Sequence, residues 1–237
     1  MIPLDNEMDA QDSLPYAGSV LQSVHLLAPM GASKGRGLQV NLRKETPMEL
    51  WDAIRNRRSC RQFSPQRIKE EDLRKIIEAG AWAPSPANNQ PWEFVILTDR
   101  EAKNRLHAAC LKSKEEAFQK SGWRWLGKYE IDFLLQVPMI IAVVGDPAKT
   151  GVDQFIAEAR DGYKYACAAA IQNMLLMAHS VGLAGLWYTL FDQKAIKALL
   201  TVPDDRTVCA LVCLGKPAGE PLQTPRKPVD ELIRRIN

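Results

Sequence analysis

The stretch "YKYACAAAIQNMLLMAHSV" (Tyr163–Val181) has the apolar spacing of a long helix. Its periodic positions are Tyr163, Ala166, Ala170, Met174, Met177 and Val181. Side chains three and four positions apart share one face of an α-helix. The small residues of "ACAAA" allow neighbouring elements to approach closely. We therefore expect a buried, closely packed helix that begins near Phe155 and ends at Val181.

Apolar runs around this helix predict the strands of a sheet, because they are short and rich in β-branched residues. These runs are Trp92–Thr98, Pro138–Gly145, Gly182–Phe191 and Thr207–Gly215. The other expected helices are Pro47–Arg58, about Leu73–Ala81, one or two between Arg100 and Gln136, and Val229–Ile236. Thr46 and Glu49 form a capping box at the first of them. Helices and strands interleave without a strict βαβ repeat.

The composition indicates a globular protein with one main domain. The chain has 237 residues, 46% of them apolar and 25% charged, which is enough apolar material for a substantial core. The formal net charge of +3 is too small to indicate nucleic-acid binding, which usually needs a concentrated basic stripe. No apolar run approaches the roughly 20 residues of a membrane span. We expect neither nucleic acid nor a membrane as a partner.

The first 45 residues differ from the rest of the chain. Acidic residues near the start argue against a signal or transit peptide. The stretch "APMGASKGRG" (Ala28–Gly37) is rich in small and turn-forming residues, as linkers are. We predict a weakly ordered extension over residues 1–45 and a compact domain over residues 46–237.

Cysteine and histidine usage predicts neither disulfides nor a metal site. The five cysteines make an odd count, and only Cys209 and Cys213 lie close together, in a predicted buried strand. This usage indicates a reducing compartment, and we expect a cytoplasmic protein. The three histidines stand far apart, and none has a Cys, Asp or Glu at zinc-ligand spacing.

"RNRRSCRQF" (Arg55–Phe63) concentrates four arginines where the first helix should end. These charges can simply complement the negative end of the helix dipole. The alternation of Arg57, Ser59 and Arg61 favours a second interpretation, because alternate side chains of an extended chain point the same way. Two guanidinium groups and a hydroxyl on one face suit a phosphate or a delocalised anion. Cys60 would then point away from that face.

Two further segments have both a local and a functional interpretation. The loop "PSPANNQPW" (Pro84–Trp92) is either a rigid turn or a set of amides that bond the edge of a heterocycle. Arg226, in a proline-rich arm, is either solvated or part of a binding site. The sequence contains no dinucleotide-binding glycine fingerprint, no Walker loop and no nucleophile elbow.

Taken in chain order, these segments resemble the FMN-dependent nitroreductase family. "RRSCRQF" is similar to its Arg-Arg-Ser-x-Arg-x-Phe signature, and "APSPANNQPWEFVIL" to its loop and following strand. "AIQNMLLMAHSVGLAGLW" resembles its central helix and strand, and "LGKPAGEP" with "PRKPVDEL" resembles its C-terminal arm. The resemblance spans about Pro47 to the C-terminus. It implies an α+β sandwich with a central mixed sheet flanked by helices, and a homodimer with FMN at the subunit interface.

The resemblance also implies which residues contact FMN. Arg57, Arg58 and Ser59 would hold the phosphate and the ribityl chain. Arg226 would close on the phosphate, and Arg61 would lie near the pyrimidine edge of the flavin. The other implied contacts are Pro84, Ser85, Asn88 and Gln90 from the partner subunit, and Trp187, Tyr188, Thr189 and Leu190 near flavin N5. The bulky "WYTLF" departs from the small, glycine-containing turn that the family often has, and it bears on the room above the flavin.

The implied function is hydride transfer from NAD(P)H through flavin N5 to an electron-poor nitroaromatic or quinone acceptor, in a ping-pong cycle. No protein nucleophile is needed, because the cofactor supplies the chemistry. Two alternatives stay open. One is another flavin reaction on the same fold, such as reductive dehalogenation, dehydrogenation or flavin fragmentation. The other is a flavin-binding protein without turnover, in which "WYTLF" blocks the ring. Lys112–Tyr129 is either a substrate-facing lid of stacking aromatics or a packed aromatic cluster.

Overall fold

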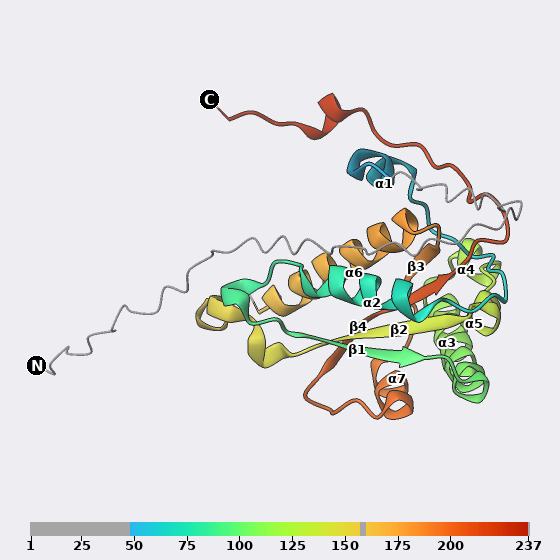
Figure 1. Ribbon diagram of the computed structural model, residues 1–237. Coiled ribbons are helices and arrows are strands. Elements are labelled where there is room, and N and C mark those ends of the chain that lie inside the picture. Colours follow the sequence, from blue (N-terminus) through green and yellow to red (C-terminus); the bar gives the residue numbers. More distant parts are fainter. Residues whose placement is uncertain (1–47, 157–159, 237) are drawn as a thin grey trace, which may run out of the picture. The chain divides into compact units, whose positions relative to one another are not determined.

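A computed structural model describes residues 48–156 and 160–236 of the chain (Figure 1). Its centre is a four-stranded sheet with the strand order β1-β2-β4-β3. The strands are β1 (Trp92–Leu97), β2 (Met139–Gly145), β3 (Ala184–Tyr188) and β4 (Thr207–Gly215). All pairings between neighbouring strands are antiparallel. The central strands β2 and β4 are buried almost throughout, because apolar side chains cover both of their faces.

Helices cover both faces of the sheet (Figure 1). They are α1 (Leu50–Asn56), α2 (Glu70–Ala81), α3 (Arg100–Ser121), α4 (Arg124–Gly127), α5 (Phe133–Gln136), α6 (Gly162–Ser180) and α7 (Gln193–Leu200). Short 3₁₀ turns lie at Pro86–Asn88, Pro147–Lys149, Gly151–Phe155 and Val229–Leu232. One apolar cluster, which includes Ile76 and Met174, packs α2 and α6 on the sheet. A second, which includes Leu106, Leu134 and Ile196, packs α3, α5 and α7 on the opposite face.

The predicted α+β class is confirmed, and the sheet differs from the mixed sheet that the resemblance implied. Within the described residues, its parallel component is a single bridge between Ser59 and Gly185 at the edge strand β3. Residues 59–63 do not form a fifth strand. Their other bridge joins Phe63 to Pro217 and is antiparallel. The sheet proper is therefore antiparallel, and residues 59–63 run along its edge.

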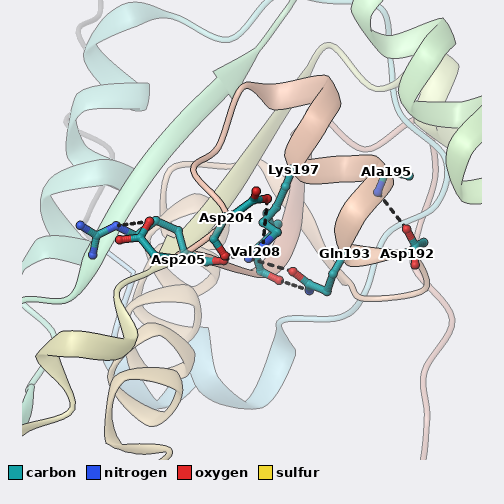
Figure 2. Close-up of polar contacts among 8 residues, drawn as sticks. Asp192, Gln193, Ala195, Lys197, Asp204, Asp205 and Val208 are labelled. Carbon is teal, nitrogen blue, oxygen red and sulfur yellow. Dashed lines mark hydrogen bonds and ion pairs between the residues drawn. The ribbon is translucent and has the colours of Figure 1, made fainter.

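Helix α7 and its connection to β4 were not anticipated from the sequence. The Asp192 carboxylate caps the helix by accepting a hydrogen bond from the Ala195 N–H (2.8 Å). The Gln193 side chain bonds the backbone of Val208 twice: its Nε2 donates to the carbonyl (2.7 Å), and its Oε1 accepts from the N–H (3.1 Å). Figure 2 shows these contacts between the start of α7 and the start of β4. The connection therefore fixes where β4 begins.

The start of the first helix also differs from the prediction. Helix α1 begins at Leu50, and Glu49 occupies its N-cap position without a side-chain hydrogen bond. The predicted capping residues Thr46 and Pro47 lie outside the described residues, as does the extension predicted over residues 1–45.

Three other helix boundaries differ as well. Helix α6 begins at Gly162 and not near Phe155, because a 3₁₀ turn precedes it. The region between Arg100 and Gln136 forms three helices, the first of which ends at Gly122 in the left-handed conformation (φ 65°). The expected C-terminal helix is only a 3₁₀ turn, because its exposed apolar residues have no surface to pack against within the described residues.

Among residues 48–156 and 160–236, no helix is long and apolar enough to cross a bilayer. This part of the chain also lacks any group of three or more His, Cys, Asp or Glu side chains that would hold a metal ion.

Candidate functional site

Backbone hydrogen bonds hold the arginine-rich segment that follows α1. The Cys60 N–H donates to the Gly185 carbonyl of β3 (3.0 Å), and the Ser64 N–H donates to the Lys216 carbonyl (2.8 Å). The segment is therefore clamped between the edge of the sheet and the start of the C-terminal arm. This clamp keeps the arginines near the start of β3.

Side chains alternate from Ser59 to Arg61, as an extended chain requires, and the alternation ends there, because Gln62 is exposed and Phe63 is buried. Cys60 is 3% exposed and Phe63 is 5% exposed, whereas Ser59 and Arg61 are exposed. Burial raises the pKa of the Cys60 thiol, so this cysteine does not have the properties of an activated nucleophile. Ser59 and Arg61 border a hollow of about 250 Å³ whose other side is formed by Gly219–Leu222 of the C-terminal arm.

Arg57 lies near charged groups from distant parts of the sequence: its neighbour Arg58, Arg226 of the C-terminal arm, and His179 of α6. Burial, followed by the charges of Arg58 and Arg226, lowers the pKa of Arg57. Burial, followed by the charges of Arg57 and Arg58, also lowers the pKa of His179. None of the ion pairs between described residues includes Arg57, Arg58 or Arg226. The cluster therefore holds positive charge that nothing in the described part of the chain neutralises.

The same cluster contains buried nitrogen atoms without hydrogen-bond partners among the described residues. They are Nε of Arg57, Nε of Arg58 and Nε2 of His179. The other nitrogens of Arg58 are occupied: Nη1 donates to the Arg55 carbonyl (2.6 Å), and Nη2 donates to Gln223 Oε1 (2.7 Å). Because a buried donor without an acceptor is costly, an anion with several oxygen atoms suits this cluster. We call Arg57, Arg58, Arg226 and His179 the anion cradle.

Arg226 is the most loosely held member of the anion cradle. Its Nη1 donates to Thr224 Oγ1 (2.9 Å) and to the Pro225 carbonyl (3.1 Å), both of which are near neighbours on an exposed arm. Its charge nevertheless acts on Arg57, so the arm brings it to the cradle from far along the chain.

The loop before β1 has a strained and well-fixed backbone. Ala87, Asn88 and Gln90 have left-handed φ angles of 50°, 52° and 44°. The Gln90 N–H donates to Ser85 Oγ (3.0 Å), and Gln90 Nε2 donates to Asn88 Oδ1 (3.3 Å). Pro84 and Ser85 border an open hollow of about 550 Å³ beside the start of α6. Strain of this kind often accompanies a functional role.

The anion cradle and this loop lie at opposite ends of α6. Arg57 and Arg58 act on His179, in the last turn of the helix. Pro86 approaches Gly162, in the first turn, so closely that a Cβ there would lie 3.1 Å from Pro86 Cγ. At a rise of 1.5 Å per residue, the two positions are roughly 25 Å apart. The two predicted halves of the cofactor site therefore do not meet within one chain.

The bulky side chains at the end of β3 differ in how deeply they are buried. Tyr188 is 3% exposed, and its ring packs edge-on against Phe133 with 5.9 Å between the ring centroids. Leu190 is half-buried against the same apolar cluster, whereas Trp187 and Thr189 are exposed. The two bulky residues that raised the question of a blocked ring therefore point into the core. Trp187 of the same segment is exposed, so the hypothesis that "WYTLF" restricts access to the ring stays a prediction.

Arg61 contacts an aromatic residue of the predicted lid. Its guanidinium carbon lies 5.6 Å from the centre of the Tyr129 ring, and its Nε donates to the Tyr129 hydroxyl (3.3 Å). A cation over a ring face and a hydrogen bond together fix the direction of the arginine. In the lid, Trp123 and Trp125 are 59% and 57% exposed, and their ring centroids are 6.0 Å apart. Trp125 also lies edge-on to Tyr129 with 6.0 Å between the ring centroids, so the segment combines aromatic packing with exposed ring surface, and its role as a lid stays a prediction.

Sequence reasoning missed three residues at this site: His179, Gln223 and Tyr129. His179 was considered only as a metal ligand, because nothing near it in the sequence suggests an anion. Gln223 stands three positions before Arg226, and the polar character of that arm was the only available signal. Tyr129 lies in a segment that was singled out, but its contact with Arg61 depends on the tertiary fold.

A family model and several relatives match this chain. The model described as "Nitroreductase family" matches residues 54–216. A protein of Archaeoglobus fulgidus with the provisional name NADH dehydrogenase/NAD(P)H nitroreductase is 32% identical over 173 residues, which cover 70% of this chain and 84% of that protein. The 5,6-dimethylbenzimidazole synthase of Rhodospirillum rubrum is 28% identical over 188 residues, covering 75% and 83%.

Solved structures match as well. A BluB-like flavoprotein from Clostridium difficile superposes with a TM-score of 0.66 at 26% identity, covering 80% of this chain and all of that one. A protein of Desulfovibrio desulfuricans solved in complex with FMN superposes with a TM-score of 0.60 at 27% identity, covering 81% and 99%. The family match over residues 54–216 therefore includes Arg57, Arg58 and His179 of the cradle, the loop before β1 and the whole sheet, and it ends before Arg226.

Proposed function

Because this chain belongs to the nitroreductase family, we propose that it is an FMN-dependent oxidoreductase that transfers hydride from NAD(P)H through flavin N5 to an electron-poor acceptor of the nitroaromatic or quinone type. The reaction is ping-pong, with the nicotinamide and the acceptor using one open pocket in turn. This arrangement agrees with the lack of a dinucleotide-binding glycine fingerprint in the sequence.

The observation that carries the proposal is the anion cradle. Its unneutralised charge and its buried donors without partners fit the phosphate of FMN, which has nearly two negative charges and several acceptor oxygens. Arg57 and Arg58 would bind the phosphate, and Ser59 would bond the ribityl chain. Arg226 would close on the phosphate from the C-terminal arm. Each of these contacts contributes to cofactor affinity and none touches the reacting atoms.

FMN supplies the redox chemistry when it is bound, because its N5 atom accepts and releases hydride. The chain's own residues would bind and orient it. Arg61, fixed by Tyr129, would place a permanent positive charge near the pyrimidine edge of the ring. Such a charge favours the reduced, anionic ring over the oxidised one. The burial of Tyr188 and the partial burial of Leu190 would leave space beside the end of β3 for nicotinamide or acceptor.

The functional unit in this proposal is a homodimer. An FMN molecule is shorter than the roughly 25 Å between the cradle and the loop before β1, so one chain cannot use both groups on the same cofactor. A second copy can supply the loop residues Pro84, Ser85, Asn88 and Gln90. Exposed aromatic residues agree with an interface, since Trp51, Trp82 and Tyr165 are 67%, 79% and 70% exposed.

Anaerobic titration tests the proposal directly. The purified full-length protein should be yellow, should release FMN and not FAD on heating, and should lose its flavin absorbance when NADH or NADPH is added without oxygen. Arg57→Ala should lose most of the flavin, whereas Arg55→Ala should keep it, because the exposed Arg55 contributes only its carbonyl to the cluster. A protein that binds no flavin after reconstitution would refute the proposal.

A second candidate is a different flavin reaction at the same site. Among the relatives, an iodotyrosine deiodinase of Thermotoga neapolitana is 25% identical over 195 residues, and the Rhodospirillum rubrum relative is named as a synthase. The exposed tryptophans of the lid agree with any planar aromatic substrate. A panel of nitroaromatic, quinone and halogenated phenol acceptors, offered to the reduced protein, separates the candidates by which member reoxidises the flavin.

A further inference from the structure

Two cysteine thiols lie together between α6 and β4, and neither has a role in the site described above. Cys167 is in the first half of α6 and is fully buried, and Cys209 is in β4 and is half-buried. All five cysteines of the chain are free thiols. The sequence gives no sign of this contact, because the two cysteines are 42 positions apart.

A β-bulge turns Cys209 toward α6. Val143 of β2 pairs with Ala210, and the next residue, Val144, pairs with Val208, so Cys209 has no partner in the ladder. Strict alternation would place Cys209 on the face opposite to Ala210. With the extra residue, both contact the apolar cluster under α6, while Val208 contacts the other cluster. A bulge is a common device for re-aiming one side chain.

Gly145 makes room for both sulphur atoms. A Cβ added at this glycine would lie 3.0 Å from Cys209 Sγ and 3.1 Å from Cys167 Sγ. The two sulphur atoms therefore lie no farther apart than the sum of these distances. Cys209 itself is partly exposed, so a small oxidant can reach its sulphur atom.

The surroundings favour the thiolate form of Cys209. Its contact with the Cys167 thiol, and the positive charge of Lys164, lower the pKa of Cys209 against the opposing effect of burial. The interaction with Cys209, together with burial, raises the pKa of Cys167. Lys164 in turn is paired with Asp161 (2.7 Å). One member of the pair is thus the better nucleophile, and the other keeps its proton.

We propose that Cys167 and Cys209 form an oxidisable dithiol that hydrogen peroxide converts to an intrachain disulfide. The Cys209 thiolate attacks one peroxide oxygen, the O–O bond breaks, and hydroxide leaves and is protonated to water. The Cys167 thiol then attacks the resulting sulfenic sulphur, the S–O bond breaks, and a second water leaves with the Cys167 proton. In total, two thiols and one peroxide give one disulfide and two waters, and the two electrons lost by sulphur reduce the peroxide.

The test is peroxide treatment of the full-length protein, followed by alkylation and peptide mapping. We expect a cross-linked peptide pair that contains Cys167 and Cys209, is lost on reduction, and accompanies the loss of two hydrogen atoms from the intact mass. Cys209→Ser should abolish the cross-link, whereas Cys60→Ser should leave it unchanged. Lys164→Gln should slow its formation several-fold at neutral pH, because the Cys209 thiolate loses its neighbouring charge.

The chain provides an internal control. Cys110 and Cys213 are also close neighbours, but both are fully buried on the other face of the sheet. At peroxide concentrations that link Cys167 to Cys209, Cys110 and Cys213 should remain free thiols. They should react with the alkylating reagent only after the protein is unfolded. A peroxide-treated protein in which Cys167 and Cys209 remain free, or in which another pair forms first, would overturn the proposal. This outcome is independent of flavin content, so it leaves the proposed function untouched.

Discussion

The arginines at the candidate site differ in how firmly the protein holds them. Arg58 is fixed by several side-chain hydrogen bonds and Arg57 by burial, so both are preorganised before any ligand arrives. Arg226 is exposed and bonds only its neighbours, so it is free to move onto an anion. Arg61 contacts the ring of Tyr129 and is not part of the cradle. These differences predict different defects when each residue is removed.

Arg226→Ala should weaken FMN binding without unfolding the protein. A hydrogen bond between charged groups contributes about 1.5–3 kcal/mol, which corresponds to roughly a 10- to 100-fold weaker affinity. Turnover should recover at saturating FMN, because Arg226 does not reach the ring. An FMN titration followed by flavin fluorescence measures the change. Lys227→Ala, next to it on the same exposed arm, is the matched control and should bind FMN as the parent does.

Arg61→Ala should lower the midpoint potential of the bound flavin, because the reduced ring loses a nearby positive charge. Tyr129→Phe should shift the potential in the same direction by a smaller amount, since the ring contact remains and only the hydrogen bond to Arg61 is lost. Anaerobic redox titration of both variants gives the answer. A potential equal to the parent's in Arg61→Ala would contradict the assignment of this residue.

At the scale of single residues, the sequence predicted the features that depend on the spacing of neighbouring residues. The alternation identified Ser59 and Arg61 as exposed and Cys60 as buried, because an extended chain has only two sides, but it did not separate Arg57 from Arg58, which are both half-buried. It could not identify His179 or Tyr129 as neighbours of the arginines. Those contacts depend on where α6 and the lid pack, which no local pattern encodes.

At the scale of elements, the contact between β3 and the arginine-rich segment joins the fold to the site. Gly185 accepts the Cys60 N–H on one side and packs closely against Leu175 of α6 on the other. Strands were predicted well, because continuous apolar runs are characteristic of central strands. Helix α7 was missed, although Asp192 before the spacing of Ile196 and Leu199 is an N-terminal signal. Its short length made the signal easy to overlook.

Gly185→Ala should destabilise the protein by about 1–3 kcal/mol, as overpacking of a core typically does. The added Cβ would lie 2.5 Å from Leu175 Cδ2 and 3.2 Å from Leu214 Cδ2, so at least one neighbour must move. Urea denaturation followed by circular dichroism measures the loss. Gly219→Ala is the control, because its nearest neighbour, Gln62 Oε1, would be 3.6 Å away, which is ordinary contact. Equal stability of the two variants would show that β3 is less tightly packed than described.

At the scale of the whole molecule, every residue assigned to the site lies between Arg57 and Arg226. The function proposed here thus requires the compact domain and a second copy of it. Deletion of residues 1–45 should leave flavin content and turnover nearly unchanged. Flavin absorbance per chain and steady-state NADH oxidation are the measurements, and a colourless truncated protein would show that the N-terminal residues are structural.

The protein should sediment as a dimer at micromolar concentration. Obligate interfaces between identical subunits often bury more than about 2,000 Å², and the exposed aromatic residues of α1 and α6 supply apolar surface for one. Analytical ultracentrifugation with flavin detection gives both the mass and the cofactor content of each species. A fully active monomer would contradict the proposed site.

Because the two ends of α6 lie roughly 25 Å apart, we expect variants with defects at opposite ends to complement each other in a mixed dimer. Arg57→Ala damages the cradle half of both sites in a dimer, and Asn88→Gly removes an amide from the loop half without disturbing its left-handed φ. If each site takes one half from each chain, a mixed dimer of the two variants has one site with both defects and one with none. Two inactive alleles expressed together should therefore complement each other and restore up to half of the activity per mixed dimer.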